Sequence, residues 1–75
     1  MPKDVVQYIV KALVAKPDKV FVTEKKEDAR VLLEIHVDEG DRGKVIGKGG
    51  STIRAIRSIA SLVSADRNVF VDVAK

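Results

Sequence analysis

The stretch that decides the fold spans residues 45–56 and reads Val45-Ile46-Gly47-Lys48-Gly49-Gly50-Ser51-Thr52-Ile53-Arg54-Ala55-Ile56. Three glycines in four residues let the backbone turn tightly and approach a ligand without a Cβ in the way. A helix is predicted to begin near Ser51, and the unpaired N–H groups and partial positive charge at a helix start suit a phosphate. The stretch therefore predicts a phosphate-binding turn with Lys48 at its tip, although a plain glycine-capped turn is the alternative.

Two other phosphate motifs do not fit this turn. A P-loop requires Gly-x4-Gly-Lys-[Ser/Thr], but Arg42 stands where the upstream glycine is needed and Gly49 replaces the hydroxyl residue. A dinucleotide fingerprint requires Gly-x-Gly-x-x-Gly inside a βαβ unit, which neither the glycine spacing nor the chain length provides. No nucleotide or dinucleotide cofactor is therefore expected.

The residues before the glycine turn predict a helix, a hairpin and a second, short helix. Apolar residues at helical spacing predict a helix over 3–15 that Pro17 ends. Strands are predicted at 20–23 and 31–37 from β-branched residues and alternation, with the charged residues 25–28 as the hairpin turn. Asp41 is predicted to cap a short helix that runs to Ile46.

The residues after the glycine turn predict a long amphipathic helix and a final strand. The helix has an apolar stripe made of Ile53, Ile56, Ile59, Ala60 and Val63. Residues 66–68 are predicted to turn, and alternation predicts a strand over 69–73. The order is therefore α-β-β-α-α-β, an α+β fold with helices packed on one face of a three-stranded mixed sheet. If the second and third strands are neighbours, they should be parallel with a right-handed connection.

The composition limits the classes of function. A chain of 75 residues predicts a single domain over 1–75 with a small core. With no cysteine and one histidine, disulfides and cysteine- or histidine-rich metal sites are excluded. No carboxylate pair, nucleophile–base pair or metal cluster is recognisable, and Asp38, Glu39 and Asp41 are not expected to hold magnesium. Neither an enzyme nor a small-molecule substrate is predicted.

Three further features predict a cytosolic protein with an anion-binding surface. Apolar runs fall short of the roughly 20 residues of a membrane span, the signal-peptide layout is absent, and Met1-Pro2 resembles a natural start. Residues 42–57 hold five positive charges and no negative ones, whereas the rest of the chain holds nine positive and eleven negative residues. This concentration favours a polyanion-binding segment, although a solvated basic helix face is the alternative.

Residues 45–56 resemble the KH-domain core, Val-Ile-Gly-x-x-Gly-x-x-Ile-x-x-Ile, at every specified position. The flanking elements resemble the bacterial, type II KH arrangement and use the whole chain. With Gly40-Asp41-Arg42-Gly43-Lys44 leading into the motif, the chain is similar to the KhpA or YlqC-like family of small, stand-alone bacterial KH-domain RNA-binding proteins. The resemblance implies binding of single-stranded RNA, and a backbone clamp would also accept single-stranded DNA.

The resemblance also assigns roles to residues. In KH domains the Gly-x-x-Gly loop clamps the backbone of about four nucleotides while the bases lie in an apolar groove. By position, the clamp would be Gly47, Lys48, Gly49 and Gly50, and the groove would include Val45, Ile46 and Ile53, with Ile35 as a candidate opposite wall. Arg42, Lys44, Arg54 and Arg57 would supply backbone electrostatics. Ser51 and Thr52 are expected as helix-start residues with a secondary phosphate contact, and Ile56 as a core residue.

Two hypotheses of function follow from this reading. The first is an RNA chaperone or post-transcriptional regulator. The second is an interaction module, because the small core and the family resemblance favour a homodimer or a heterodimer with a larger KH-containing RNA-binding protein. The aromatic residues Tyr8, Phe21 and Phe70 lie far from the glycines in sequence, so base-stacking platforms are not expected. His36 is expected on the polar face of its strand.

Overall fold

The computed structural model describes residues 2–64 and 68–74. It contains three helices, α1 (Pro2–Leu13), α2 (Arg42–Ile46) and α3 (Ser51–Val63), and three strands, β1 (Phe21–Glu27), β2 (Arg30–His36) and β3 (Asn68–Val73). Short 3-10 turns lie at Pro17–Lys19, Glu39–Asp41 and Lys48–Gly50. The α-β-β-α-α-β order of the helices and strands confirms the prediction from the sequence.

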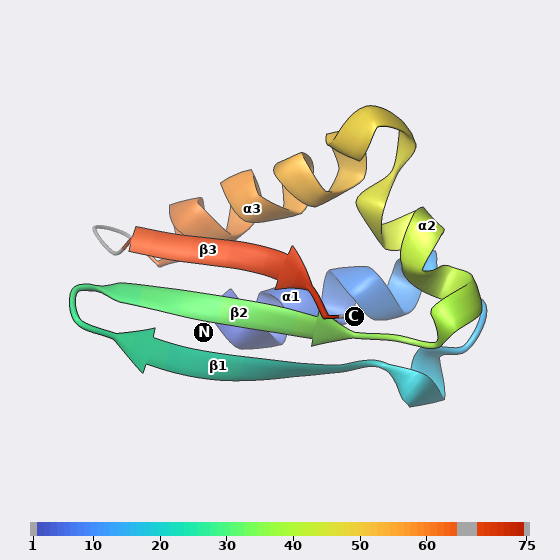
Figure 1. The fold of residues 1–75 in the computed structure, drawn as a ribbon, viewed down its shortest axis with the longest axis horizontal. Coiled ribbons are helices and arrows are strands. Elements are labelled where there is room, and N and C mark those ends of the chain that lie inside the picture. Colours follow the sequence, from blue (N-terminus) through green and yellow to red (C-terminus); the bar gives the residue numbers. More distant parts are fainter. Residues whose placement is uncertain (1, 65–67, 75) are drawn as a thin grey trace.

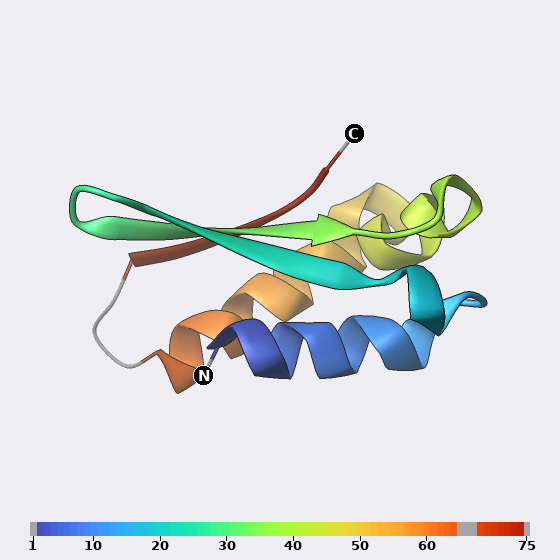
Figure 2. The same cartoon turned by 90° about the horizontal axis from the view of Figure 1, so that it is seen from below.

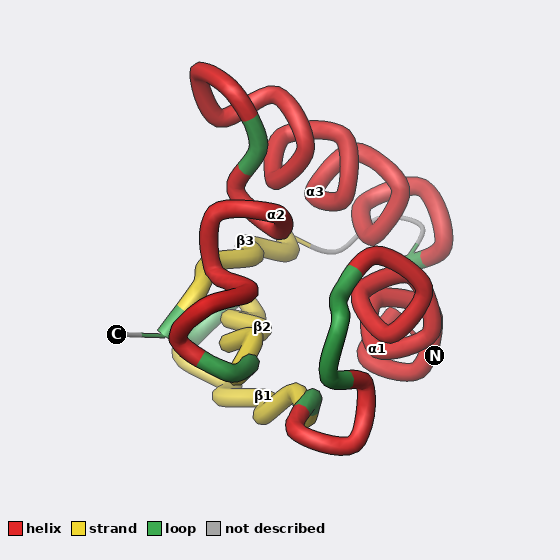
Figure 3. Tube along the Cα trace, turned by 90° about the vertical axis from the view of Figure 1, so that its right-hand side faces the viewer, coloured by secondary structure: helices red, strands yellow, loops and turns green. Residues whose placement is uncertain are grey.

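The three strands form one mixed sheet in the order β1-β2-β3 (Figure 1). β1 pairs antiparallel with β2, from Phe21 opposite His36 to Glu27 opposite Arg30. β2 pairs parallel with β3, from Arg30 opposite Asn68 to Ile35 opposite Val73. The predicted hairpin and the predicted parallel pair are both confirmed. α1 and α3 cover one face of the sheet (Figure 2), and α2 lies at the end of the sheet where β2 finishes (Figure 3).

The core lies between the sheet and the helices. Every second residue of β2 and β3 is buried, which fixes the pairing register because a slip of one residue would expose the whole apolar set. The helices contribute apolar side chains from their inner faces, namely Val6, Val10, Ile53, Ile56 and Ala60. The burial of Ile56 confirms its expected place in the core. The opposite face of the sheet keeps Phe21 and Phe70 exposed.

The hairpin turn is shorter than the sequence suggested. β1 continues through Lys25, Lys26 and Glu27, so the prediction of a turn over 25–28 was wrong. The turn consists of Asp28 and Ala29, and Asp28 has a φ of 52°, a left-handed conformation that Asp tolerates better than most residues. Lys and Glu have low strand propensity, but pairing with β2 outweighs that preference.

α1 ends at Leu13 rather than at the predicted Ala15. The N–H groups of Ala15 and Lys16 donate to the carboxylate of Asp41. These two bonds replace the helical hydrogen bonds that would continue α1. At the other end of the chain, Asn68 belongs to β3 and not to the predicted turn, while residues 66 and 67 of that turn lie outside the described residues. In the described ranges, no helix is long and apolar enough to cross a membrane.

Candidate nucleic-acid interface

The glycine turn depends on three positive φ angles. Gly47 ends α2 with φ 77° and ψ 167°, and the 3-10 turn that follows contains Gly49 with φ 64° and Gly50 with φ 79°. The Gly50 N–H donates to the Gly47 carbonyl at 3.0 Å, which closes the turn. Because L side chains rarely adopt such angles, glycine suits this backbone path better than other residues at all three positions. Lys48 lies exposed within this turn.

Gly47 is the most constrained of the three. A Cβ at this position would overlap the Thr52 side chain and would lie 2.8 Å from the Thr52 backbone nitrogen. Its φ and ψ also fall in a region that is almost exclusive to glycine. The turn therefore lies directly against the first residues of α3, and Gly47 permits this contact.

The start of α3 directly follows the glycine turn. Gly50 occupies the N-cap position in a left-handed conformation, and it offers no side-chain hydrogen bond to the helix. Ser51 and Thr52 are the first two residues of the helix, which confirms their place at its start. The Ser51 N–H donates to the Lys48 carbonyl. The next N–H groups of the 13-residue α3 have no partner within the helix, and they lie at the end of α3 that follows Lys48.

Arg54 and Arg57 diverge although both belong to α3. Nη1 of Arg54 donates to the Gly49 carbonyl at 2.8 Å, so this guanidinium lies against the glycine turn. Nη2 of Arg57 donates instead to the Val71 carbonyl at 3.0 Å, which directs this side chain to β3. The structure thus brings Arg54 to the turn and places Arg57 between α3 and the sheet.

Lys44 and Arg42, on α2, differ in their contacts. The Lys44 ammonium lies 3.4 Å from the Asp41 carboxylate, which offsets part of its charge. Arg42 is half-buried, and its Nε is buried without a hydrogen-bond partner in the described part of the chain.

Asp41 connects the residues after α1 to α2, the helix that ends at the glycine turn. It occupies the N-cap position of α2, but its side chain makes no capping bond, so the predicted cap was wrong. Its buried carboxylate instead accepts from the N–H groups of Ala15 and Lys16 at 3.2 and 3.1 Å. Burial alone would raise the pKa of the Asp41 carboxyl, but these two donors and Lys44 outweigh it and hold that pKa below its usual value. The charged carboxylate therefore ties the end of α1 to the start of α2.

The apolar residues assigned to a groove are buried to different extents. Val45 and Ile35 are fully buried in the core, so neither offers surface to a ligand in this structure. Ile53 retains 9% exposure, and Ile46 is only partly buried against the core. The expectation of Ile35 as an opposite wall fails because alternation along β2 turns its side chain towards the helices.

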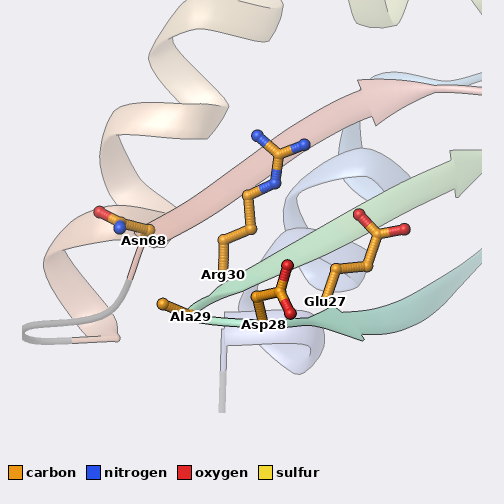
Figure 4. A pocket seen from close by; sticks show the side chains of 5 residues that line it. All are labelled: Glu27, Asp28, Ala29, Arg30 and Asn68. Carbon is orange, nitrogen blue, oxygen red and sulfur yellow. The ribbon is translucent and has the colours of Figure 1, made fainter.

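Two open pockets lie at opposite ends of the sheet. One, of about 410 Å³, borders the start of α2 and is lined by His36, Val37, Glu39, Arg42 and Ala74. The other, of about 560 Å³, lies at the hairpin and is lined by Glu27, Asp28, Ala29, Arg30 and Asn68 (Figure 4). Two carboxylates and one guanidinium line the hairpin pocket, so its charge does not favour a polyanion. Within the described residues, no group of three metal-ligating side chains comes together.

Two tertiary features were missed from the sequence. The His36 ring stacks on Phe21 with centroids 4.3 Å apart, and its Nε2 lies 3.3 Å from the Thr23 hydroxyl. The outer edge of β3 faces α3 and contributes the Val71 carbonyl to the space beside Arg57. The stacking of His36 on Phe21 follows from the β1–β2 register, and the contact of Arg57 with Val71 follows from the packing of α3. Neither contact can be recognised in the local sequence.

Comparison with known proteins assigns the family. The family described as "KhpA/KhpB, KH domain" matches residues 3–74. The protein named RNA-binding protein KhpA from Chlamydia trachomatis is 44% identical over 69 residues, covering 92% of this chain and 88% of the relative. Its namesake from Clostridium perfringens is 38% identical over 73 residues, covering 95% and 97% of the two chains.

A third relative, RNA-binding protein KhpA from Aquifex aeolicus, is 44% identical over 61 residues, covering 81% of this chain and 77% of the relative. No solved structure matches the chain. The type II KH order of elements, the Gly47–Gly50 turn before α3 and these matches lead to one conclusion. The chain belongs to the KhpA/KhpB KH-domain family.

Proposed function

We propose that the chain binds single-stranded RNA through a phosphate clamp at residues 47–50 and acts as an RNA chaperone or post-transcriptional regulator. The observation that carries the proposal is the glycine turn itself, with three positive φ angles directly before the start of α3. The names of the relatives add the ligand class, since each is called an RNA-binding protein.

The clamp works by placing donors where a phosphodiester can pass closely. The absence of side chains at Gly47, Gly49 and Gly50 lets the RNA backbone approach the loop, and the α3 start adds N–H donors and positive potential. Lys48 supplies an exposed positive charge at the turn. Arg54 lies against the Gly49 carbonyl, so its guanidinium stays beside the phosphate path. Ile46 and Ile53 offer the adjacent apolar surface for bases.

A salt titration tests this proposal directly. A clamp that neutralises about three phosphates of a single strand releases counterions, so log Kd should rise with log salt with a slope of about 2. Fluorescence anisotropy of a labelled eight-nucleotide RNA, measured between low and moderate salt, gives this slope. Binding that is independent of salt, or no binding even at low salt, would rule the clamp out.

A second candidate function, assembly with another KH domain, is favoured by one observation. The helical apolar surface, defined as Tyr8, Ile59, Leu62 and Val63, remains exposed on α1 and α3, with Tyr8 at 78% and Leu62 at 80%. These helices pack side by side on the same face of the sheet (Figure 2). Exposed large apolar side chains on neighbouring elements favour a protein partner, either a second copy or a larger KH-containing RNA-binding protein.

The assembly function predicts a dimer that depends on the helical apolar surface. We expect sedimentation at high concentration to give a dimer for the wild type and a monomer for Leu62→Lys, because a lysine charge would be desolvated in the interface. Phe70→Lys, on the opposite face of the sheet, is the matched control and should remain dimeric. A monomeric wild type that also recovers no KH-containing partner would contradict the assembly function.

A further inference from the structure

We propose that the uncovered face of the sheet binds an extended, basic segment of a partner protein. This face is the side of the sheet turned away from α1 and α3, and no described helix or strand packs on it (Figure 2). The inference does not depend on the proposed RNA clamp, which lies at the start of α3. It adds a protein-binding surface on the side of the sheet opposite the helical apolar surface.

Side-chain pairs form successive rows on the uncovered face. Every second residue of β2 and β3 is buried against the helices, so the residues between them face the other way. The strand registers give three rows in order from the hairpin, made of Leu32 with Phe70, Glu34 with Asp72, and His36 with Phe21. Neighbouring rows are about 6.8 Å apart, since two residues of a strand span that distance. An apolar, an acidic and an aromatic row therefore follow one another.

The apolar row offers a place for one side chain. Phe70 is 43% exposed, and a hollow of about 80 Å³ lies beside it, lined also by Leu32, Arg30 and Glu27. The Arg30 guanidinium lies over the Phe70 ring, 4.9 Å from its centroid, and so covers one side of the row. A small hollow next to an aromatic ring and a leucine suits an aliphatic side chain. Exposed apolar side chains gathered on one face favour a protein partner.

Carboxylates flank the apolar row on both sides. They are Glu34 and Asp72 in the next row, and Glu27 and Asp28 in the hairpin pocket (Figure 4). Two cations, Lys25 and Arg30, share the uncovered face with these four carboxylates. The excess negative charge attracts a basic segment and repels a nucleic acid, unlike residues 42–57, which hold five positive charges and no negative ones.

The spacing of the rows matches an extended peptide. Alternate residues of an extended chain face the same side and lie about 6.8 Å apart, which is the distance between rows. A sequence of the form basic-x-aliphatic-x-basic-x-apolar would place its first basic residue beside Glu27 and Asp28 and its aliphatic residue in the hollow. The second basic residue would then lie between Glu34 and Asp72. The last apolar residue would cover the stacked rings of Phe21 and His36.

Two fluorescent peptides of equal composition and charge test this spacing. The first is Lys-Thr-Leu-Thr-Lys-Thr-Val, which has both lysines and both apolar residues on one face of an extended chain. The second, Lys-Leu-Thr-Thr-Lys-Val-Thr, has the lysines and the apolar residues on opposite faces. Anisotropy titration of the wild type should show the first peptide binding about tenfold more tightly, because the second cannot satisfy the acidic and apolar rows together. Equal affinities would overturn the proposal.

A pair of matched variants tests the acidic row. Glu34→Gln/Asp72→Asn removes its charge with little change of shape and should weaken the first peptide about tenfold. Asp18→Asn/Glu24→Gln removes the same charge from exposed positions outside this face, where Glu24 is paired with the buried Leu33, and should change the affinity little. Equal losses would reduce the binding to net charge and overturn the proposal. The peptide comparison uses the wild type, so it remains decisive if a variant fails to fold.

Phe70→Ser distinguishes a peptide from other occupants of this face. The variant should weaken the first peptide about tenfold, because the wall of the hollow is lost. Its affinity for an eight-nucleotide RNA and its sedimentation should match the wild type. Weaker RNA binding with unchanged peptide affinity would assign the face to nucleic acid. Loss of a wild-type dimer with unchanged peptide affinity would assign it to a second copy of the chain. Either result would overturn the proposal.

Discussion

The Lys48→Asp/Gly49→Asp variant is expected to bind short single-stranded RNA at least about 100-fold more weakly than the wild type, a loss of about 3 kcal/mol. The change replaces the ammonium of the proposed clamp with a carboxylate and adds a second carboxylate where the RNA backbone would approach most closely. Charged hydrogen bonds to phosphate are then lost and replaced by repulsion between like charges. Anisotropy titration with a labelled eight-nucleotide RNA measures this loss.

The backbone accommodates the substitutions at a modest cost, so the variant should fold. Gly49 has φ 64° and ψ 18°, a left-handed conformation that Asp tolerates, and a Cβ there meets no atom within 4 Å. Lys48 is exposed. The circular dichroism spectrum should therefore match the wild type and the urea midpoint should fall only modestly, which separates loss of binding from loss of fold.

A matched control separates the clamp from net charge. Lys25→Glu/Lys26→Ala removes the same amount of positive charge from β1, where both lysines are exposed. This control should weaken RNA binding only slightly at moderate salt, because screening limits interactions beyond about 10 Å. Equal losses in the two variants would mean that net charge, and not the glycine turn, determines affinity. Unchanged binding in the loop variant would place the RNA site elsewhere on the chain.

Gly47→Ala is expected to destabilise the fold by about 3 kcal/mol, lowering Tm by roughly 10–20 °C. A Cβ at residue 47 would overlap the Thr52 side chain and lie 2.7 Å from its Cβ, so the turn and α3 would have to separate. The residue would also hold φ 77° and ψ 167°, which alanine avoids. Separation would misplace the N–H donors at the start of α3, so RNA binding should fall as well. Thermal unfolding followed by circular dichroism measures the loss of stability.

Two other glycines serve as controls for Gly47→Ala. Gly49→Ala faces open space in a left-handed conformation, so we expect a smaller loss, of about 1 kcal/mol. Gly43→Ala lies within α2 with no atom within 4 Å, so we expect a gain of roughly 0.5–1 kcal/mol from helix propensity. Similar losses in all three variants would show that the contact with Thr52 does not determine the cost at Gly47.

Local patterns predicted most of the fold because each element leaves a periodic signal. Apolar spacing placed α1 and α3 to within two residues, and alternation placed β2 and β3 to within one. The same reasoning failed at Lys25–Glu27, where charged residues read as a turn, because the pairing with β2 that makes them a strand is not local. It also failed for Asp41, which looked like a helix cap but accepts bonds from residues 25 and 26 positions away.

The candidate site also has a part that the sequence predicted and a part that it did not. The glycine turn was predictable because glycine is the residue type that adopts positive φ most readily, and Gly47, Gly49 and Gly50 all adopt such angles. The directions of the arginines were not predictable. Arg54 and Arg57 stand three residues apart on one helix, yet one contacts Gly49 and the other Val71. Which carbonyl each guanidinium meets depends on how β3 packs against α3.

The sequence by itself therefore determined the order of elements, the parallel direction of the last two strands if they are neighbours, and the position of the glycine turn, because these depend on periodicity, chain connection and glycine conformation. Only the tertiary structure decided which side chains remain available to a ligand. Val45 and Ile35 are buried in the core, Lys44 is paired with Asp41, and Arg57 donates to the Val71 carbonyl, whereas Lys48 remains exposed. Burial and pairing depend on contacts between distant segments, and no local pattern records them.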